Sequence, residues 1–495
     1  MVPNLNNIQG DIWPRLAKKY ETFLFFEILD MARFKKELGS FSKYITTAKA
    51  ACETRGRLYS RKENGENNIV ETISTNISLS AAGLARLGKT DLGDFIFKGG
   101  MYADMVTVGL DRDEEWHGEF KGSRGQIDGV FILAGSSEDT VNNWIIDVIK
   151  PKFADPTING EPAASKFLFT QSGAVLNEYD VEHFGWKDGA SQPLLKGLDD
   201  ETTNTKGPGL IKPGYIILGE EGDTEPSPDW AKDGSFMVFR RLRQLVPEFT
   251  QWVVKQIGDQ AKDGDKMKLG VISTLSSRLV GRWPDGAPLD LMPGPPEGQE
   301  DTYKGLPEDA PGQGEEHMAL TNSNDFDFRD TQWQDRCPFA SHIRKVRPRA
   351  DRTNMDGTFD DTHAMIRRGI SFGPLTTNQE KSVGVTTHDR GLLFVSYQAN
   401  LHNGFRQVQN GEMGEQDQFP PGKARHYDNK QPGLDPIIGQ WAKDDDHSNY
   451  ITMPRYDNPK KVEQWKLERS VIAEGGEYFF SPSISGIREI CGVCA

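Results

Sequence analysis

Cysteine is scarce in this chain, with four residues among 495. Cys52 and Cys337 are predicted to be lone interior thiols. Cys491 and Cys494 form a C-x-x-C near the end of the sequence, but no strand–helix–strand unit precedes them, as it would in a redox-active pair of the thioredoxin kind. A redox centre built on cysteine is therefore not expected.

Long hydrophobic runs are also missing. Stretches such as Phe23–Phe26 are the size of a strand, far below the ~18 apolar residues that a membrane span needs. With 36% hydrophobic and 26% charged residues, the composition predicts a soluble globular protein and no membrane partner. The first residues lack the basic and apolar regions of a signal peptide. Two alternatives follow: an intracellular protein, or the mature form of an exported one.

Basic charge is in deficit. The net charge is −15 and the sequence pI is about 5.2, which argues against a nucleic-acid partner. None of the nine histidines forms an H-E-x-x-H pair, and no G-x-G-x-x-G is present. A zinc protease site and a dinucleotide-binding fingerprint are therefore not expected.

A strand followed by an amphipathic helix recurs four times along the chain. The helices have i, i+3, i+4 apolar spacing, and the strands are almost continuously apolar, as strands covered by helices are. The pattern predicts a duplicated α+β domain, each copy closing as a four-stranded antiparallel sheet with helices on one face. The four predicted strands span residues 22–29, 129–135, 234–242 and 391–399.

Loop-rich segments separate these units. The polar stretch 199–213 is rich in Gly, Pro and Thr, which predicts a linker between domains 1–210 and 211–495. The Pro/Gly-rich stretch 284–325 is too long for a simple turn and predicts an ordered loop or a lid over a site. The stretch 410–440 is similar in composition.

Two segments contain candidate chemical groups. The first, Gly185 to Pro193, reads G-W-K-D-G-A-S-Q-P. It is either an ordinary turn or a place where glycines let the backbone approach a flat ligand while Asp188 points at it. The second combines Ser341-His342-Ile-Arg344 with a basic run to Arg352 and the later I-R-R-G-I-S-F-G at 366–373. It is either a solvated basic loop and a strand, or an anion-binding site.

These segments, in this order, resemble the signature of the dye-decolorising peroxidases, particularly the fungal members. Further segments resemble the family as well: residues 7–12, 233–240, 281–283 and 391–398. The resemblance implies two ferredoxin-like domains and a non-covalently bound haem b held mainly by the C-terminal domain. Ala495 stands where a C-x-x-C-H attachment motif would need histidine, so covalent attachment is not expected.

The resemblance also implies roles for individual residues. His342 would be the proximal ligand of the haem iron, with Asp435 as a candidate partner for its second ring nitrogen. Asp188 would be the distal acid–base and Arg367 would stabilise charge on the peroxide, with Arg368 as the alternative arginine. Arg344 or one of its basic neighbours would suit the haem propionates. Leu392 and Phe394, two apart on one strand face, would form the wall of the distal pocket.

The expected reaction is reduction of H₂O₂ through ferryl intermediates, with oxidation of dyes, phenols and other aromatic substrates. A carboxylate ordinarily has a pKa near 4, so an acidic activity optimum is expected. Bulky dyes would require electron transfer from a surface Trp or Tyr. The stretch that follows Phe405 lacks the Trp expected from fungal relatives, while Tyr397 is another candidate.

Other possibilities remain open. The carboxylates of Asp356, Asp360 and Asp361 could hold Mn²⁺, although solvated surface charge is the simpler interpretation. A non-catalytic haem-binding or haem-handling protein on the same scaffold would need His342 but neither Asp188 nor Arg367. A chlorite-decomposing enzyme would lack the distal Asp. Fungal relatives are generally extracellular, so secretion is expected.

Overall fold

The structure is a computed structural model. It describes residues 2–66, 70–107, 111–156, 160, 162–176, 181–200, 209–258, 269–293, 321, 323–328, 331, 334, 336–352, 359–412, 432–441, 449–456, 458 and 460–493. Most of the predicted lid (294–320), most of the third loop-rich segment (413–431) and Cys494 lie outside these residues. Of the linker predicted at 199–213, residues 201–208 also lie outside the described residues.

The four predicted strand–helix units are confirmed. β1 (Tyr20–Ile28) leads into α1 (Met31–Phe41), whose N-terminus is capped by the Asp30 side chain. β3 (Gly129–Gly135) leads into α7 (Glu138–Trp144). β5 (Ser235–Gln244) precedes α9 (Val246–Ile257), and β8 (Gly391–Gln398) precedes a π-helix, His402–Glu412.

The strands form two antiparallel groups that join into one sheet, in the order β4-β1-β3-β2-β11-β5-β8-β6, with β7 also pairing with β8. The first half of the chain supplies β1 to β4, and the second half supplies β5 to β8 and β11. The groups meet where Leu79 and Ser80 of β2 pair with Phe480 and Phe479 of β11. The predicted duplicated α+β fold is therefore confirmed, and its two sheets share an edge. The domain boundary near residue 210 stays a prediction.

The remaining strands are β2 (Ile73–Ser80), β4 (Ser165–Ala174), β6 (Ile366–Arg367), β7 (Ile370–Phe372), β9 (Tyr450–Pro454), β10 (Val462–Lys466) and β11 (Val471–Ser481). The remaining helices are α2 (Ala48–Glu63), α3 (Ala81–Arg86), α4 (Phe95–Gly99), α5 (Met101–Thr107), α6 (Gly118–Gly122), a π-helical turn (Ile145–Ile149), α8 (Lys150–Phe153), α10 (Leu269–Val280), α12 (His342–Val346), α13 (Phe359–Thr362), α14 (Asn378–Val383) and α15 (Ile484–Cys491). Short 3-10 turns span Ser42–Tyr44, Asp113–Glu115, Pro213–Tyr215, Asp229–Ala231 and Arg349–Arg352.

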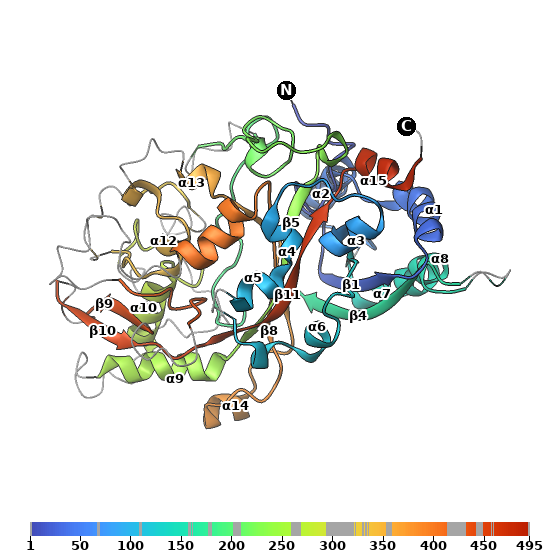
Figure 1. Ribbon diagram of the computed structural model, residues 1–495. Coiled ribbons are helices and arrows are strands. Elements are labelled where there is room, and N and C mark those ends of the chain that lie inside the picture. The colour runs from blue at the N-terminus through green and yellow to red at the C-terminus, as the bar shows by residue number, and fades with distance from the viewer. Residues whose placement is uncertain are drawn as a thin grey trace.

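Helices lie on both sides of the central strands. Figure 1 shows α9, α10 and α12 on one side of β5 and β11, with α1 and α8 on the other side, and with both termini at the same end of the molecule. The small β9–β10 sheet lies beside α9 and α10. None of the helices described is long and apolar enough to cross a membrane.

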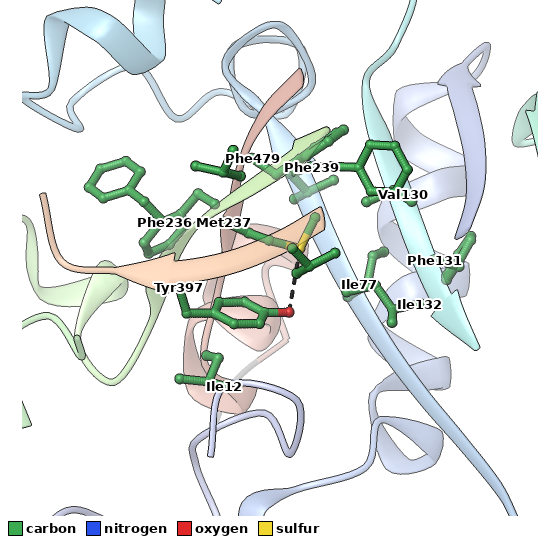
Figure 2. Close-up of a cluster of buried hydrophobic side chains, with 14 of the residues drawn as sticks. Ile12, Ile77, Val130, Phe131, Ile132, Phe236, Met237, Phe239, Tyr397 and Phe479 are labelled. Atoms are coloured by element: carbon green, nitrogen blue, oxygen red, sulfur yellow. Dashed lines mark hydrogen bonds between the residues drawn. The ribbon is translucent and has the colours of Figure 1, made fainter. Parts of the chain in front are cut away.

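The core between the two halves is largely aromatic and aliphatic. Phe25 stacks on Phe169 and meets the ring of Phe239 edge-on, so strands of both halves share one cluster. Figure 2 shows Tyr397 of β8 within this core, between Ile12 and Met237, with its hydroxyl bonded to the Met237 sulfur. Of the two thiols predicted to be interior, Cys337 is buried and Cys52 is half-buried.

Candidate active site

A cavity of about 290 Å³ lies between the second-half strands, α12 and the segment 182–193. Its wall is mainly apolar, with a few polar groups, which is typical of a cofactor or ligand pocket. The apolar wall residues include Phe184, Trp186, Leu242, Val280, Phe326, Ile343, Val346, Met365, Leu392, Phe394, Phe405, Val408, Ile437, Ile438 and Val471. The polar ones include Glu182, Asp188, His342, Arg347, Arg349, His363 and Arg367.

His342 lies on this cavity at the first residue of α12. Its Nδ1 is 2.8 Å from Oδ2 of Asp435, whose carboxyl is fully buried. An ionised carboxylate only accepts hydrogen bonds, so Nδ1 donates. Among the described residues the second ring nitrogen has no hydrogen-bond partner, so it can serve a ligand in the cavity. Asp435 was the candidate partner from the sequence, and the structure brings the two residues together.

The loop after Asp435 holds its carboxylate. The backbone N–H groups of Ile437 and Ile438 donate to Oδ1 at 2.8 and 3.0 Å. Burial alone would raise the pKa of Asp435, but the charge and hydrogen bond of His342 and these two N–H groups outweigh burial, so the pKa is lowered. The carboxylate is therefore built to stay charged beside the imidazole.

Arg344 does not lie on the cavity, and the expectation that it meets the propionates is wrong. Its guanidinium is fully buried, donates from Nε and Nη2 to both oxygens of Asp351, and donates to the carbonyls of Thr331 and Cys337. Arg344 follows His342 by two positions on a helix, so its side chain leaves from a different face. All of its observed bonds are structural.

Asp188 lies on the cavity in a turn that glycines permit. Gly185 and Gly189 have φ angles of 97° and 74°, which other residues rarely adopt. The carboxyl of Glu182 fastens the turn, accepting from the backbone N–H groups of Phe184 at 2.9 Å and Trp186 at 3.0 Å. Burial raises the pKa of Glu182 to about 7 despite these bonds. The segment is a turn, and Asp188 lines a cavity; the approach of this turn to a flat ligand stays a prediction.

Arg367 lies beside Asp188. Its Nη1 is 3.0 Å from Oδ1 of Asp188, and its Nη2 donates to the carbonyl of Ser191 at 2.9 Å. Both side chains are about one-third exposed. Arg368 is buried and faces away from this cavity, donating to the carbonyls of Asp11, Ile12 and Pro14. Of these two arginines, Arg367, the last residue of β6, is therefore the one that lines the cavity.

β8 supplies one wall of the cavity. Leu392 and Phe394 line it, while Leu393 and Val395 between and beyond them are fully buried on the opposite face. Tyr397 is on the buried face too, is only 1% exposed, and donates to Oδ2 of Asp11 at 2.8 Å. It is therefore not a surface residue, as an electron-entry site would require.

Sequence reasoning did not single out several cavity residues, although Arg347 and Arg349 are among the basic neighbours of Arg344. Arg347 and Arg349, rather than Arg344, place cations at the cavity, and His363 is a second histidine on its wall. The basic run 344–352 indicated cations but not their directions, because only the short helix and the turn after it set them. Nothing in the sequence around His363 indicated a cavity position.

The residues present fit a haem. One imidazole offers a free ring nitrogen, and Asp188 and Arg367 lie elsewhere on the same wall. The apolar side chains suit a flat macrocycle, and Arg347 and Arg349 suit its carboxylates. When bound, the haem supplies the redox chemistry, and His342 is the residue that would ligate its iron.

Two short sequence motifs that are typical of other enzyme classes occur in this chain, but neither has the local structure that its function requires. Gly83–Thr90 reads G-x-x-x-x-G-K-T, but Gly83 lies inside α3, where a side chain would strike the Asp128 carbonyl. Gly369–Gly373 reads G-x-S-x-G, but Ser371 is within β7 rather than at a strand-to-helix elbow. Neither a phosphate loop nor a hydrolase site results.

The proposed manganese ligands are only partly described. Asp361 is 3.7 Å from the guanidinium of Arg347, whereas Asp356 and the side chain of Asp360 lie outside the described residues. No group of three His, Cys, Asp or Glu side chains arranged for a metal occurs within the described part of the chain. Mn²⁺ binding stays a prediction.

Comparison with known proteins decides the family. The profile of the DyP dimeric alpha+beta barrel domain matches residues 7–159, and that of the Dyp-type peroxidase C-terminal domain matches residues 192–420. The chain belongs to the dye-decolorising peroxidase family. It is therefore a peroxidase, an oxidoreductase, and the peroxidases of this family are haem enzymes.

Dye-decolorising peroxidases of fungi are similar over the whole chain. The peroxidase of Mycetinis scorodonius is 33% identical over 99% of this chain and 88% of its own length. That of Auricularia auricula-judae is 33% identical over 98% of this chain and 86% of its own. Among solved structures, an ancestral D-type dye-decolorising peroxidase is 37% identical with a TM-score of 0.81, covering 99% of this chain and 100% of that one.

Proposed function

We propose that this peroxidase binds haem b non-covalently between His342 and the Asp188–Arg367 pair, and uses them to reduce H₂O₂. The observation that carries the proposal is that all three side chains line one cavity, with Asp435 bonded to His342. A haem-binding protein without activity would need only the histidine. Both domain profiles of the peroxidase family match this chain, which favours a catalytic protein over a haem-binding protein without activity.

Asp188 would move the proton. H₂O₂ must lose a proton from one oxygen and gain it on the other before the O–O bond breaks, and a positioned carboxylate can accept it and return it. Arg367 has a permanent positive charge next to Oδ1 of Asp188, so it would stabilise negative charge that develops on the peroxide. Leu392 and Phe394 would restrict the space so that peroxide sits close to both groups.

The reductants would be small aromatic compounds and dyes. Reduction of one H₂O₂ to two waters takes two electrons and two protons, which two phenols supply by losing one hydrogen atom each. A solved structure of a dye-decolorising peroxidase in complex with 2,6-dimethoxyphenol is 33% identical to this chain, with a TM-score of 0.78 over 99% of this chain and all of that one. That likeness supports phenols as substrates here. Secretion and Mn²⁺ oxidation stay predictions.

The test is the visible spectrum of the purified holoenzyme before and after one equivalent of H₂O₂. An immediate shift of the Soret band in the wild type, with an unchanged resting spectrum and a slow shift in Asp188→Asn, is the expected result. A Soret band that H₂O₂ leaves unchanged would contradict the proposal, and so would a shift at wild-type rate in Asp188→Asn.

A further inference from the structure

A second and larger cavity, of about 850 Å³, also borders Asp188 and Arg367. Asp188, Arg367 and Leu392 line both cavities, so the two spaces are neighbours separated by these side chains. The outer cavity is built from residues 13–19, one face of α2, residues 174–176, the 188–194 turn and residues 366–371.

The outer cavity is strongly basic although the chain carries a net charge of −15. Seven of its lining residues are cations, and three are acids. The acids are Glu182, Asp188 and Asp199; the cations are Arg15, Lys18, Lys19, Arg55, Lys62, Arg367 and Arg368. Burial raises the pKa of Glu182 to about 7, so near neutral pH this carboxyl is only partly ionised and adds less negative charge to the cavity. A basic hollow on an acidic protein attracts anions.

Most of these cations are not neutralised by carboxylates. Lys18 bonds Glu21 and Arg367 bonds Asp188. Arg15, Lys19, Arg55 and Lys62 form no ion pair with a carboxylate in the described part of the chain. Burial and the charge of Arg15 both lower the pKa of Arg55, so the two guanidinium groups repel each other. An anion between them would relieve that repulsion.

The basic groups are interleaved with apolar ones. Arg55, Leu58, Tyr59 and Lys62 lie at i, i+3, i+4 and i+7 of α2 and form one face of that helix toward the cavity. The same space is also lined by Trp13, Leu16, Val175 and Leu176. An aromatic ring and a charged substituent can therefore be bound together.

Arg368 fixes the part of the wall that carries Trp13 and Arg15. Its guanidinium donates to the carbonyls of Asp11, Ile12 and Pro14 at 2.8 to 3.1 Å. Arg15 has a φ of 142°, a conformation that favours glycine, and it is exposed at the cavity. The wall is thus held in a geometry that the loop would not adopt by itself.

We propose that this outer cavity binds small aromatic anions, rings that carry a sulfonate or a carboxylate, and so selects anionic reductants beside Asp188 and Arg367. The binding site stands on the cavity alone, and the selection of reductants rests on the proposed function. The cations of α2 and of residues 15–19 would hold the anionic group, and Trp13 and Tyr59 would contact the ring.

Calorimetric titration of the resting holoenzyme with benzenesulfonate tests the site without turnover, because no peroxide is present. Its neutral counterpart, benzenesulfonamide, should bind much more weakly. Arg55→Gln and Lys62→Gln should each weaken benzenesulfonate binding roughly fivefold, the value of one unit charge at contact distance in water. Arg57→Gln is the matched control, because Arg57 is an exposed cation of the same helix that does not line the cavity.

Three results would overturn the assignment: no binding of benzenesulfonate, equal binding of both probes, or equal weakening by Arg57→Gln. Turnover then tests selection. Arg55→Gln should raise KM for 4-hydroxybenzenesulfonate more than for 4-hydroxybenzenesulfonamide, and an equal effect on both would contradict selection. If benzenesulfonate binds while H₂O₂ leaves the Soret band unchanged, the proposed function is wrong and the anion site stands.

Discussion

The imidazole of His342 and the buried carboxylate of Asp435 are joined by a 2.8 Å hydrogen bond, although 93 residues separate them in the sequence. Two backbone N–H groups hold the carboxylate in place. A carboxylate on the far nitrogen makes an imidazole a stronger electron donor to a bound metal. If His342 ligates the haem iron as proposed, Asp435 would therefore set its strength as an electron donor.

Asp435→Asn should keep the haem but weaken the donor. Asparagine can still accept from Nδ1 without carrying a charge, so we expect a lower iron–histidine stretching frequency in the ferrous enzyme. The reaction with H₂O₂ should slow by roughly ten- to a hundredfold. Resonance Raman and stopped-flow spectra measure the two effects. An unchanged stretching frequency would show that Asp435 has no electronic role.

His342→Ala should abolish tight haem binding, because the cavity loses its proposed iron ligand. The measurement is the haem-to-protein ratio from the Soret band after reconstitution. His363→Ala is the matched control, since His363 lines the same cavity and should leave the ratio unchanged. Loss of haem in the control and retention in His342→Ala would reverse the assignment of the ligand.

Asp188→Asn should slow the reaction with H₂O₂ by roughly 10²- to 10⁴-fold, the usual contribution of a positioned acid–base. The amide can still accept from Arg367, so the cavity should keep its shape. Stopped-flow Soret changes give the rate. Asp285→Asn in the adjacent loop is the control, because Asp285 makes a structural bond to the N–H of Ala287 and should leave the rate unaltered.

Replacement of the two neighbouring arginines should have different consequences. Arg367→Gln should slow the reaction with H₂O₂ by roughly 10²- to 10³-fold with little loss of stability. Arg368→Gln should instead lower the free energy of unfolding, by about 1–3 kcal/mol for a buried acceptor left unsatisfied. Denaturant unfolding and stopped-flow rates separate the two. If Arg368→Gln slowed the reaction and Arg367→Gln lowered the stability, Arg368 would be the distal arginine.

Glu182 should make the protein more stable in mild acid than at neutral pH. Its pKa rises on folding from 4.5 to about 7 because the carboxyl is buried, so the folded state binds the proton more tightly. This contribution is complete below about pH 4.5 and disappears as the pH rises through 7. Glu182→Gln should remove this part of the pH dependence of the unfolding free energy. The exposed Glu63→Gln is the control, and an identical profile in both variants would contradict the prediction.

The sequence alone determined the local units and the identity of the chemical groups. Four strand–helix repeats could be predicted because apolar periodicity is a property of neighbouring residues. His342, Asp188 and Arg367 stood out because each lies in a compact motif with the spacing of the family. Asp435 could be named as a partner of His342 only as a candidate.

The tertiary structure decided where each side chain points and which side chains lie close together. Arg344 faces Asp351 rather than the cavity because its position on α12 turns it away. Arg367 lines the cavity beside His342 and Arg368 does not, because the Arg368 guanidinium points to the carbonyls of residues 11–14 instead. The basic outer cavity combines segments more than 300 residues apart. No sequence pattern encodes such a surface, because it exists only after the sheet register has fixed which side chains meet.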